Sequence, residues 1–186
     1  MRPRLVLVGA SLGGVEALRA LLTTLVANFP AALVIVLHRG PEETGDLLPM
    51  LQRNCALPVG FPLDKERILP GQVYIAPPNY HLLVEDDHFA YTLDDPEDYA
   101  RPSISVLFES AVDASSAQVT GIVMTGMGQD GAHGLAALHR RGGLAIVQSP
   151  GEAMAPEMPR AALALIPEVR QMTLLEIGAW LAKLAR

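Results

Sequence analysis

Apolar residues in the first third of the chain form two continuous runs with a spaced pattern between them. The runs cover residues 4–8 and 32–37, and apolar side chains recur at helical spacing across 15–29. Short continuous runs are typical of strands buried on both faces of a parallel sheet, and the spaced positions are typical of a helix packed on that sheet. This region therefore predicts a strand, a helix and a second strand.

The middle of the chain has a different pattern. Short aromatic or β-branched segments at 72–76, 81–85 and 88–93 are separated by turn-forming residues. They predict a small antiparallel hairpin insertion around residues 72–93. Weaker patterns favour a short helix within 46–54 and a short strand within 59–62.

After this insertion, runs and helical stripes alternate again. Ser103 precedes apolar residues at i, i+3, i+4, i+7 and i+8, which predicts a helix with Ser103 as its N-cap. The remaining pattern predicts strands at 118–125 and 144–148, and helices at 131–141, 158–165 and from 174 onward. The expected fold class is α/β: a doubly wound, mostly parallel sheet flanked by helices, in a single domain over residues 1–186.

Composition and charge narrow the functional classes. Twenty acidic residues against 14 basic ones give a net charge of -6, with no basic stripe to neutralise a phosphate backbone, so no nucleic-acid partner is expected. The single cysteine, Cys55, cannot form an internal disulfide, which fits a reducing compartment. The longest apolar run, 31–37, is far shorter than the roughly 20 residues that cross a bilayer. We expect a soluble, cytoplasmic protein that is not embedded in a membrane.

Polar residues of unusual type follow three of the predicted strands. Ser11 lies in a Gly-x-Ser-x-Gly turn after the first strand, His38 ends the second, and Asp130 lies in the glycine-rich loop after strand 118–125. The carboxyl ends of parallel strands share one crevice, so these side chains are expected to meet. They predict a catalytic triad with Ser11 as nucleophile, His38 as general base and Asp130 as orienting acid. Backbone N–H groups near Leu12 and in the stretch Met127-Gly128 are candidate donors to the oxyanion, and the sequence does not decide between them.

Each triad residue also has a structural interpretation when taken alone. Ser11 could be the N-cap of a glycine-rich turn, His38 a structural histidine, and Asp130 the cap of the helix that follows it. A dinucleotide site is disfavoured because Ser11 takes the place of the middle glycine and His38 that of the acidic ribose ligand. No histidine pair has metal-ligand spacing, so no metal is expected.

Several ordered motifs carry a family resemblance across nearly the whole chain. They are Val8-Gly9-Ala10-Ser11 with Gly13-Gly14, His38, residues 70–77 with His81-Leu82, Arg101-Pro102-Ser103, and residues 125–131. In these the chain resembles the catalytic domain of CheB-type protein-glutamate methylesterases of bacterial chemosensory systems. The resemblance implies that Ser11, His38 and Asp130 are the triad, and that Met127 supplies an oxyanion donor.

The same resemblance implies a substrate and partners, and it implies no cofactor. The substrates would be methylated glutamates on the cytoplasmic domains of chemoreceptors, with glutamine deamidation as a second activity. Leu12 stands where the family often has threonine, and Val15 replaces a proline, so the alternative of a non-catalytic module that docks on receptors or signalling proteins stays open. Because the sequence begins at the first catalytic strand, we expect no receiver domain in cis, with a separate receiver or scaffold protein as a further partner.

Overall fold

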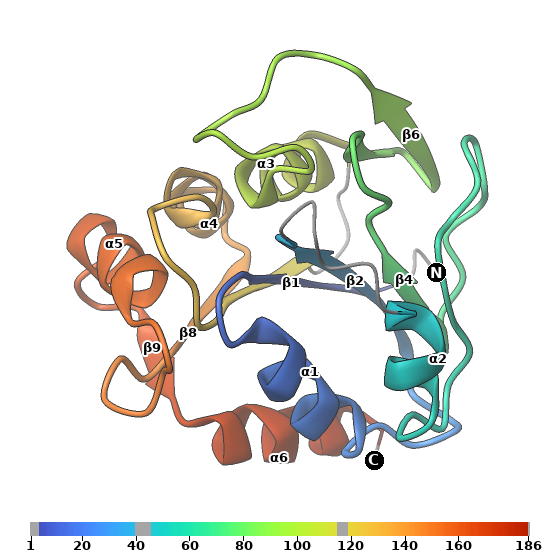
Figure 1. Ribbon diagram of the computed structural model, residues 1–186, viewed down its shortest axis with the longest axis horizontal. Coiled ribbons are helices and arrows are strands. Elements are labelled where there is room, and N and C mark those ends of the chain that lie inside the picture. The colour runs from blue at the N-terminus through green and yellow to red at the C-terminus, as the bar shows by residue number, and fades with distance from the viewer. Residues whose placement is uncertain (1–3, 40–45, 115–118, 186) are drawn as a thin grey trace.

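A seven-stranded sheet runs through the middle of the protein, with helices on both of its faces (Figure 1). The computed structural model describes residues 4–39, 46–114 and 119–185. The strand order is β3-β4-β2-β1-β7-β8-β9, and every neighbouring pair is parallel. The strands are β1 (Arg4–Ala10), β2 (Ala31–Leu37), β3 (Val59–Gly60), β4 (Val73–Ile75), β7 (Val119–Val123), β8 (Leu144–Gln148) and β9 (Arg170–Met172). The predicted doubly wound parallel sheet is confirmed.

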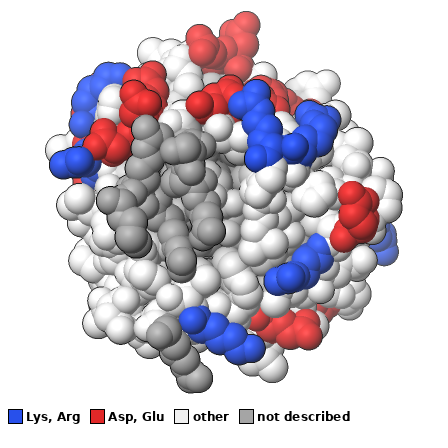
Figure 2. Space-filling view, turned by 180° about the vertical axis from the view of Figure 1, so that it is seen from behind, with Lys and Arg blue, Asp and Glu red and all other residues white. Residues whose placement is uncertain are grey.

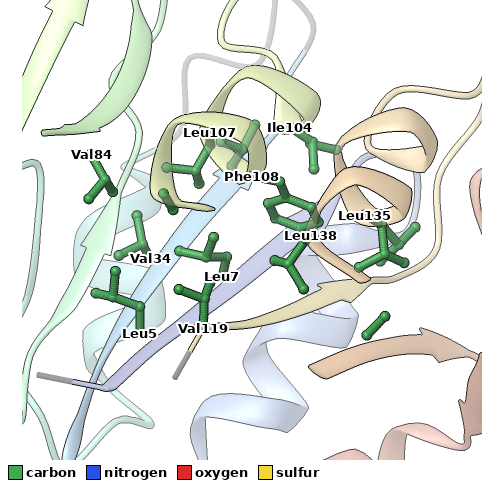
Figure 3. Close-up of a cluster of buried hydrophobic side chains, with 14 of the residues drawn as sticks. Leu5, Leu7, Val34, Val84, Ile104, Leu107, Phe108, Val119, Leu135 and Leu138 are labelled. Atoms are coloured by element: carbon green, nitrogen blue, oxygen red, sulfur yellow. The ribbon is translucent and has the colours of Figure 1, made fainter. Parts of the chain in front are cut away.

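Alternate residues of the central strands point into two separate cores. Leu5 and Leu7 of β1 belong to one core, and Val6 and Val8 to the other. The first core is covered by α3 (Ile104–Ala114), α4 (Ala132–Arg140) and α5 (Glu157–Leu165), and the second by α1 (Gly14–Leu22), α2 (Leu47–Gln52) and α6 (Leu174–Leu184). Figure 3 shows Phe108 of α3 and Leu138 of α4 reaching down to the first face of the sheet. Burial of these apolar side chains is the main force that holds the helices on each face to the sheet.

A separate two-stranded hairpin lies against α3. It consists of β5 (His81–Glu85) and β6 (His88–Thr92), which pair antiparallel. The predicted insertion is therefore present, but its first segment was placed wrongly. Residues 73–75 form β4, which pairs parallel with β2 and β3 inside the main sheet. A three-residue apolar run can be a buried strand of a parallel sheet or a strand of an antiparallel hairpin, so its pattern alone could not decide between the two.

Two further elements differ from the sequence prediction. Helix α1 ends at Leu22 and not near residue 29, because the Thr23 and Thr24 hydroxyls donate to carbonyls one turn back and the chain leaves the helix there. Leu25 and Phe29 stay buried without being helical, which explains the longer apolar pattern. Strand β9 was not predicted, because its exposed Arg-Gln-Met sequence lies at the sheet edge and carries no apolar run.

Two observations concern the surface. No helix in the described ranges is long and apolar enough to cross a membrane. On the face shown in Figure 2, Lys and Arg side chains lie among Asp and Glu side chains and form no continuous stripe on the described surface.

Candidate active site

The candidate site lies where the chain order of the sheet reverses. From β1 the chain proceeds outward to β2 on one side and later returns to β7 on the other. Ser11 follows β1 and His38 follows β2, and the His38 N–H donates to the Ala10 carbonyl at 3.0 Å. The Ser11 N–H donates to the Thr125 carbonyl beyond β7, at 2.9 Å. Three adjacent strand ends therefore bring together residues that are far apart in the sequence, at the crevice where open α/β sheets bind ligands.

The turn at Ser11 leaves its hydroxyl available for chemistry. Gly13 and not Ser11 is the N-cap of α1, with φ of 78° and no side-chain cap. Within the described residues, the Ser11 hydroxyl forms no hydrogen bond. The interpretation of Ser11 as a helix cap is therefore wrong.

The loop after β7 approaches Ser11 very closely at Gly126. A Cβ atom on Gly126 would lie 2.7 Å from the Ser11 Cβ and 2.1 Å from the Met158 Sδ. Only a residue without a side chain fits between Ser11 and Met158 at this backbone separation. This approach brings the backbone that follows Gly126 to the side of the serine.

Several backbone N–H groups around Ser11 have no hydrogen-bond partner in the described part of the chain. They include those of Leu12 and Met127, whereas the neighbouring Gly126 N–H donates to the Ala155 carbonyl at 2.9 Å. The Thr125 hydroxyl donates to the Leu12 carbonyl at 2.9 Å, which ties the two segments together. Free N–H groups next to a nucleophile are suited to stabilise a developing oxyanion.

The Asp130 carboxylate is buried and surrounded by donors. Its Oδ1 accepts hydrogen bonds from the Ser103 hydroxyl at 2.9 Å, the Ser105 N–H at 3.0 Å and the Gly131 N–H at 2.8 Å. Its Oδ2 accepts from the Ile104 N–H at 2.7 Å. Asp130 therefore caps the N-terminus of α3, and the expectation that it caps the following helix is wrong, since α4 begins after Gly131 without a side-chain cap.

His38 contacts the remaining side of this carboxylate. Its Nε2 lies 2.9 Å from Asp130 Oδ2, although the N–H bond is not directed along that line. Burial by itself raises the pKa of the Asp130 carboxyl, but the neighbouring His38 side chain and the hydrogen bonds from the Ile104 and Ser105 N–H groups outweigh burial and hold that pKa below its ordinary value. Asp130 is thus a stable anion beside the imidazole.

Two hollows meet at His38 and Arg39. The smaller, of about 460 Å³, is lined by Ser11, Leu12 and Gly13 together with His38. The larger, of about 680 Å³, has an apolar floor that includes Leu37 and Ile75. A group held in the smaller hollow would lie beside the Ser11 hydroxyl, and the larger hollow has room for neighbouring parts of the same ligand.

The sequence indicated Ser11, His38 and Asp130, but some of the hydrogen-bond partners of Asp130 were missed. Ser103 was assigned only as a helix cap, which its hydrogen bond from the Val106 N–H confirms. Its contact with Asp130 was missed, as was that of His81 with Ser103. Local spacing carries no signal for contacts between residues more than 20 positions apart. Among the described residues no group of three or more metal-ligating side chains gathers.

The fold and the site together define a class of protein. The sheet is doubly wound and parallel, and one crevice holds a free serine hydroxyl, a histidine beside a buried carboxylate, and N–H donors without partners among the described residues. These are the groups that a serine-dependent ester hydrolase uses. The CheB methylesterase family model matches residues 6–181. The chain belongs to the CheB methylesterase family.

Individual relatives agree with this assignment. The chain is 40% identical over 159 residues to a putative protein-glutamate methylesterase/protein-glutamine glutaminase of Leptospira interrogans, which covers 85% of this chain and 82% of that protein. It is 36% identical to a protein-glutamate methylesterase/protein-glutamine glutaminase of Chromohalobacter salexigens, over 98% of this chain and 52% of the relative. The crystal structure of the Thermotoga maritima CheB methylesterase catalytic domain superposes with a TM-score of 0.92 at 27% identity, covering 99% of this chain and 100% of that one.

Proposed function

We propose that the chain hydrolyses methyl esters of glutamate side chains, with Ser11 as nucleophile, His38 as general base and Asp130 as the orienting acid. The observation that carries this assignment is the contact of 2.9 Å between His38 Nε2 and the buried Asp130 carboxylate, at the strand end next to the free hydroxyl of Ser11. Because Nε2 lies beside Asp130, the other ring nitrogen, Nδ1, is left to accept the serine proton.

In the first half-reaction, Ser11 Oγ attacks the ester carbonyl carbon while its proton passes to His38 Nδ1. The carbonyl oxygen becomes an oxyanion, which accepts hydrogen bonds from the N–H groups of Leu12 and Met127. As the tetrahedral intermediate collapses, the bond to the methoxy group breaks and His38 returns the proton to it. Methanol leaves, and the glutamyl group stays on Ser11 as an ester.

In the second half-reaction, water attacks the glutamyl ester and gives its proton to His38. Collapse releases the glutamate carboxylic acid, and the proton on His38 returns to Ser11 Oγ. The same sequence acting on a glutamine side chain releases ammonia in place of methanol, which would make deamidation a second activity of the site.

The substrate we assign is a methylated chemoreceptor. The enzyme would act on it in the cytoplasm, where the helical signalling domains of such receptors lie. The support comes from membership of the CheB methylesterase family and from the relatives named above. The exposed side chains of Leu12 and Met127 flank the nucleophile and offer apolar contacts to a protein surface. A separate receiver or scaffold protein is a further proposed partner.

A fluorophosphonate probe, combined with methanol release from a methylated receptor domain, tests the assignment. Wild type is expected to form one adduct on Ser11 and to release methanol, while Ser11→Ala and His38→Ala lose both. Ser110→Ala, on α3, is the matched control and keeps both activities. Absence of an adduct on wild type, or equal labelling of His38→Ala, would refute the triad and favour the competing non-catalytic binding module.

A further inference from the structure

A serine that the reaction does not consume lies directly behind the triad carboxylate. Ser103 is fully buried, and its hydroxyl donates to Asp130 Oδ1 at 2.9 Å. It lines neither of the two hollows, so it cannot touch a substrate held in them. We propose that Ser103 is a positioning residue that fixes the orientation of the Asp130 carboxylate, and that His81 holds Ser103 in place. This inference rests on the proposed role of Asp130 in the triad.

The two oxygens of the carboxylate have different partners. Oδ2 faces His38 Nε2, whereas Oδ1 accepts from the Ser103 hydroxyl and from the N–H groups of Ser105 and Gly131. Rotation of the carboxylate about its Cβ–Cγ bond would break the bonds to Oδ1 and turn Oδ2 away from the imidazole. The donors on Oδ1 therefore aim Oδ2. Of these donors, the Ser103 hydroxyl is the one that a substitution can remove without changing the backbone.

Ser103 is itself held at both ends. Its N–H donates to His81 Nδ1 at 3.1 Å, and its Oγ accepts from the Val106 N–H at 3.3 Å. Because a backbone N–H can only donate, Nδ1 of His81 must be unprotonated, and Nε2 must carry the hydrogen that it donates to the Asp95 carbonyl at 3.1 Å. His81 is 1% exposed, so water does not compete for these bonds. A continuous line of hydrogen bonds thus runs from the loop at Asp95 to the triad.

The test measures kcat and KM for a methyl ester substrate, at a temperature where melting curves show each variant to be folded. Ser103→Ala is expected to lower kcat about tenfold, the effect of losing one charge-assisted hydrogen bond, with KM within about twofold of wild type. Ser103→Cys keeps a near-isosteric but weak donor and should fall between the two. Ser110→Ala is the matched control, because it removes hydrogen bonds to Val84 and Leu107 from the same helix without touching Asp130.

Two substitutions at His81 test whether kcat depends on its hydrogen-bond acceptor, a dependence that a merely structural role would not show. Asn can place its amide oxygen where Nδ1 accepts from Ser103, so His81→Asn should retain kcat, whereas His81→Leu should lose it to the same extent as Ser103→Ala. A kcat within twofold of wild type in Ser103→Ala would overturn the inference and leave the proposed function intact. If that variant does not fold, wild-type kcat in Ser103→Cys overturns it equally. Wild type without hydrolysis or an adduct on Ser11 would overturn both.

Discussion

Two contacts between a nitrogen base and a carboxylate in this protein have the same length and lie in opposite environments. The nitrogen-to-oxygen distance is 2.9 Å both in the His38–Asp130 pair and in the Lys65–Glu85 pair at the hairpin. The side chains of the first pair are 19% and 3% exposed, and those of the second 58% and 51%. Water screens the exposed pair, while the buried pair has lost its hydration and must recover that free energy from protein donors.

The surroundings of the two carboxylates show how the buried charge is maintained. Asp130 accepts hydrogen bonds from a hydroxyl and from backbone N–H groups at the start of α3. The neighbouring His38 and the N–H groups of Ile104 and Ser105 outweigh the effect of burial and lower its pKa. Glu85 also has a pKa below its ordinary value, but there the hydrogen bond from the Lys65 ammonium is the largest cause. Equal distance therefore does not mean equal function, because only the buried carboxylate is fixed in direction by its surroundings.

The largest effect is expected when the charge of the buried pair is removed. Asp130→Asn should lower kcat by about 10³–10⁴-fold, because the neutral amide no longer supports the imidazolium and favours the wrong imidazole tautomer. Ester hydrolysis and a melting curve on the same preparation check this, the curve showing that the fold is kept. Loss of less than tenfold would contradict the role of Asp130, and Glu85→Gln, which removes the exposed carboxylate, is the matched control and should keep wild-type kcat.

A smaller effect is expected from crowding the buried region. Gly126→Ala places a methyl group against Ser11 and Met158, so activity should fall roughly tenfold or more and the free energy of unfolding by about 1–3 kcal/mol. Gly60→Ala is the matched control, because a Cβ there would meet nothing within 4 Å. Kinetics and urea unfolding distinguish the two variants. Equal behaviour would mean that the close approach at Gly126 has no consequence for the site.

The sequence predicted those features of the fold and of the candidate site that depend on local pattern. Continuous apolar runs identified β1, β2 and β7, and the polar residues after them identified Ser11, His38 and Asp130 as candidates. The shared crevice followed from a general property of parallel sheets, and not from any feature of these residues. In the structure Ser11 and His38 line one hollow, and His38 lies 2.9 Å from Asp130, while the catalytic roles of the three residues stay a prediction.

What the sequence could not predict depends on long-range packing. Asp130 precedes a helix, so a local cap was the natural alternative, yet its partners lie on α3, more than 20 residues earlier. His81 begins the predicted segment 81–85, but the pattern gave no sign that its side chain is buried against Ser103. Residues 72–76 had a strand pattern that could not reveal whether the partner strand was parallel or antiparallel. Residues 40–45, which follow His38 closely in the sequence, lie outside the described residues.

Acid should reveal how much the charged form of Asp130 stabilises the fold. The folded-state pKa of Asp130 is lowered, so its contribution to stability is complete above the unfolded pKa of about 3.9 and is lost as the pH falls through the lower folded value. Urea unfolding between pH 7 and pH 3 should give a free energy that falls more steeply for wild type than for Asp130→Asn. Parallel curves for the two proteins would show that the hydrogen bonds on Asp130 do not stabilise its charged form.

The smallest effect is expected at the exposed pair. Glu85→Gln and Lys65→Met should each shift the melting temperature less than any substitution in the Asp130 cluster, because water solvates the partner left behind. The shift should disappear in 1 M salt, where the Debye length is about 3 Å. Melting curves of wild type and both variants at low and high salt check this. A salt-resistant loss as large as that of Gly126→Ala would mean that distance, and not burial, sets the strength of these two pairs.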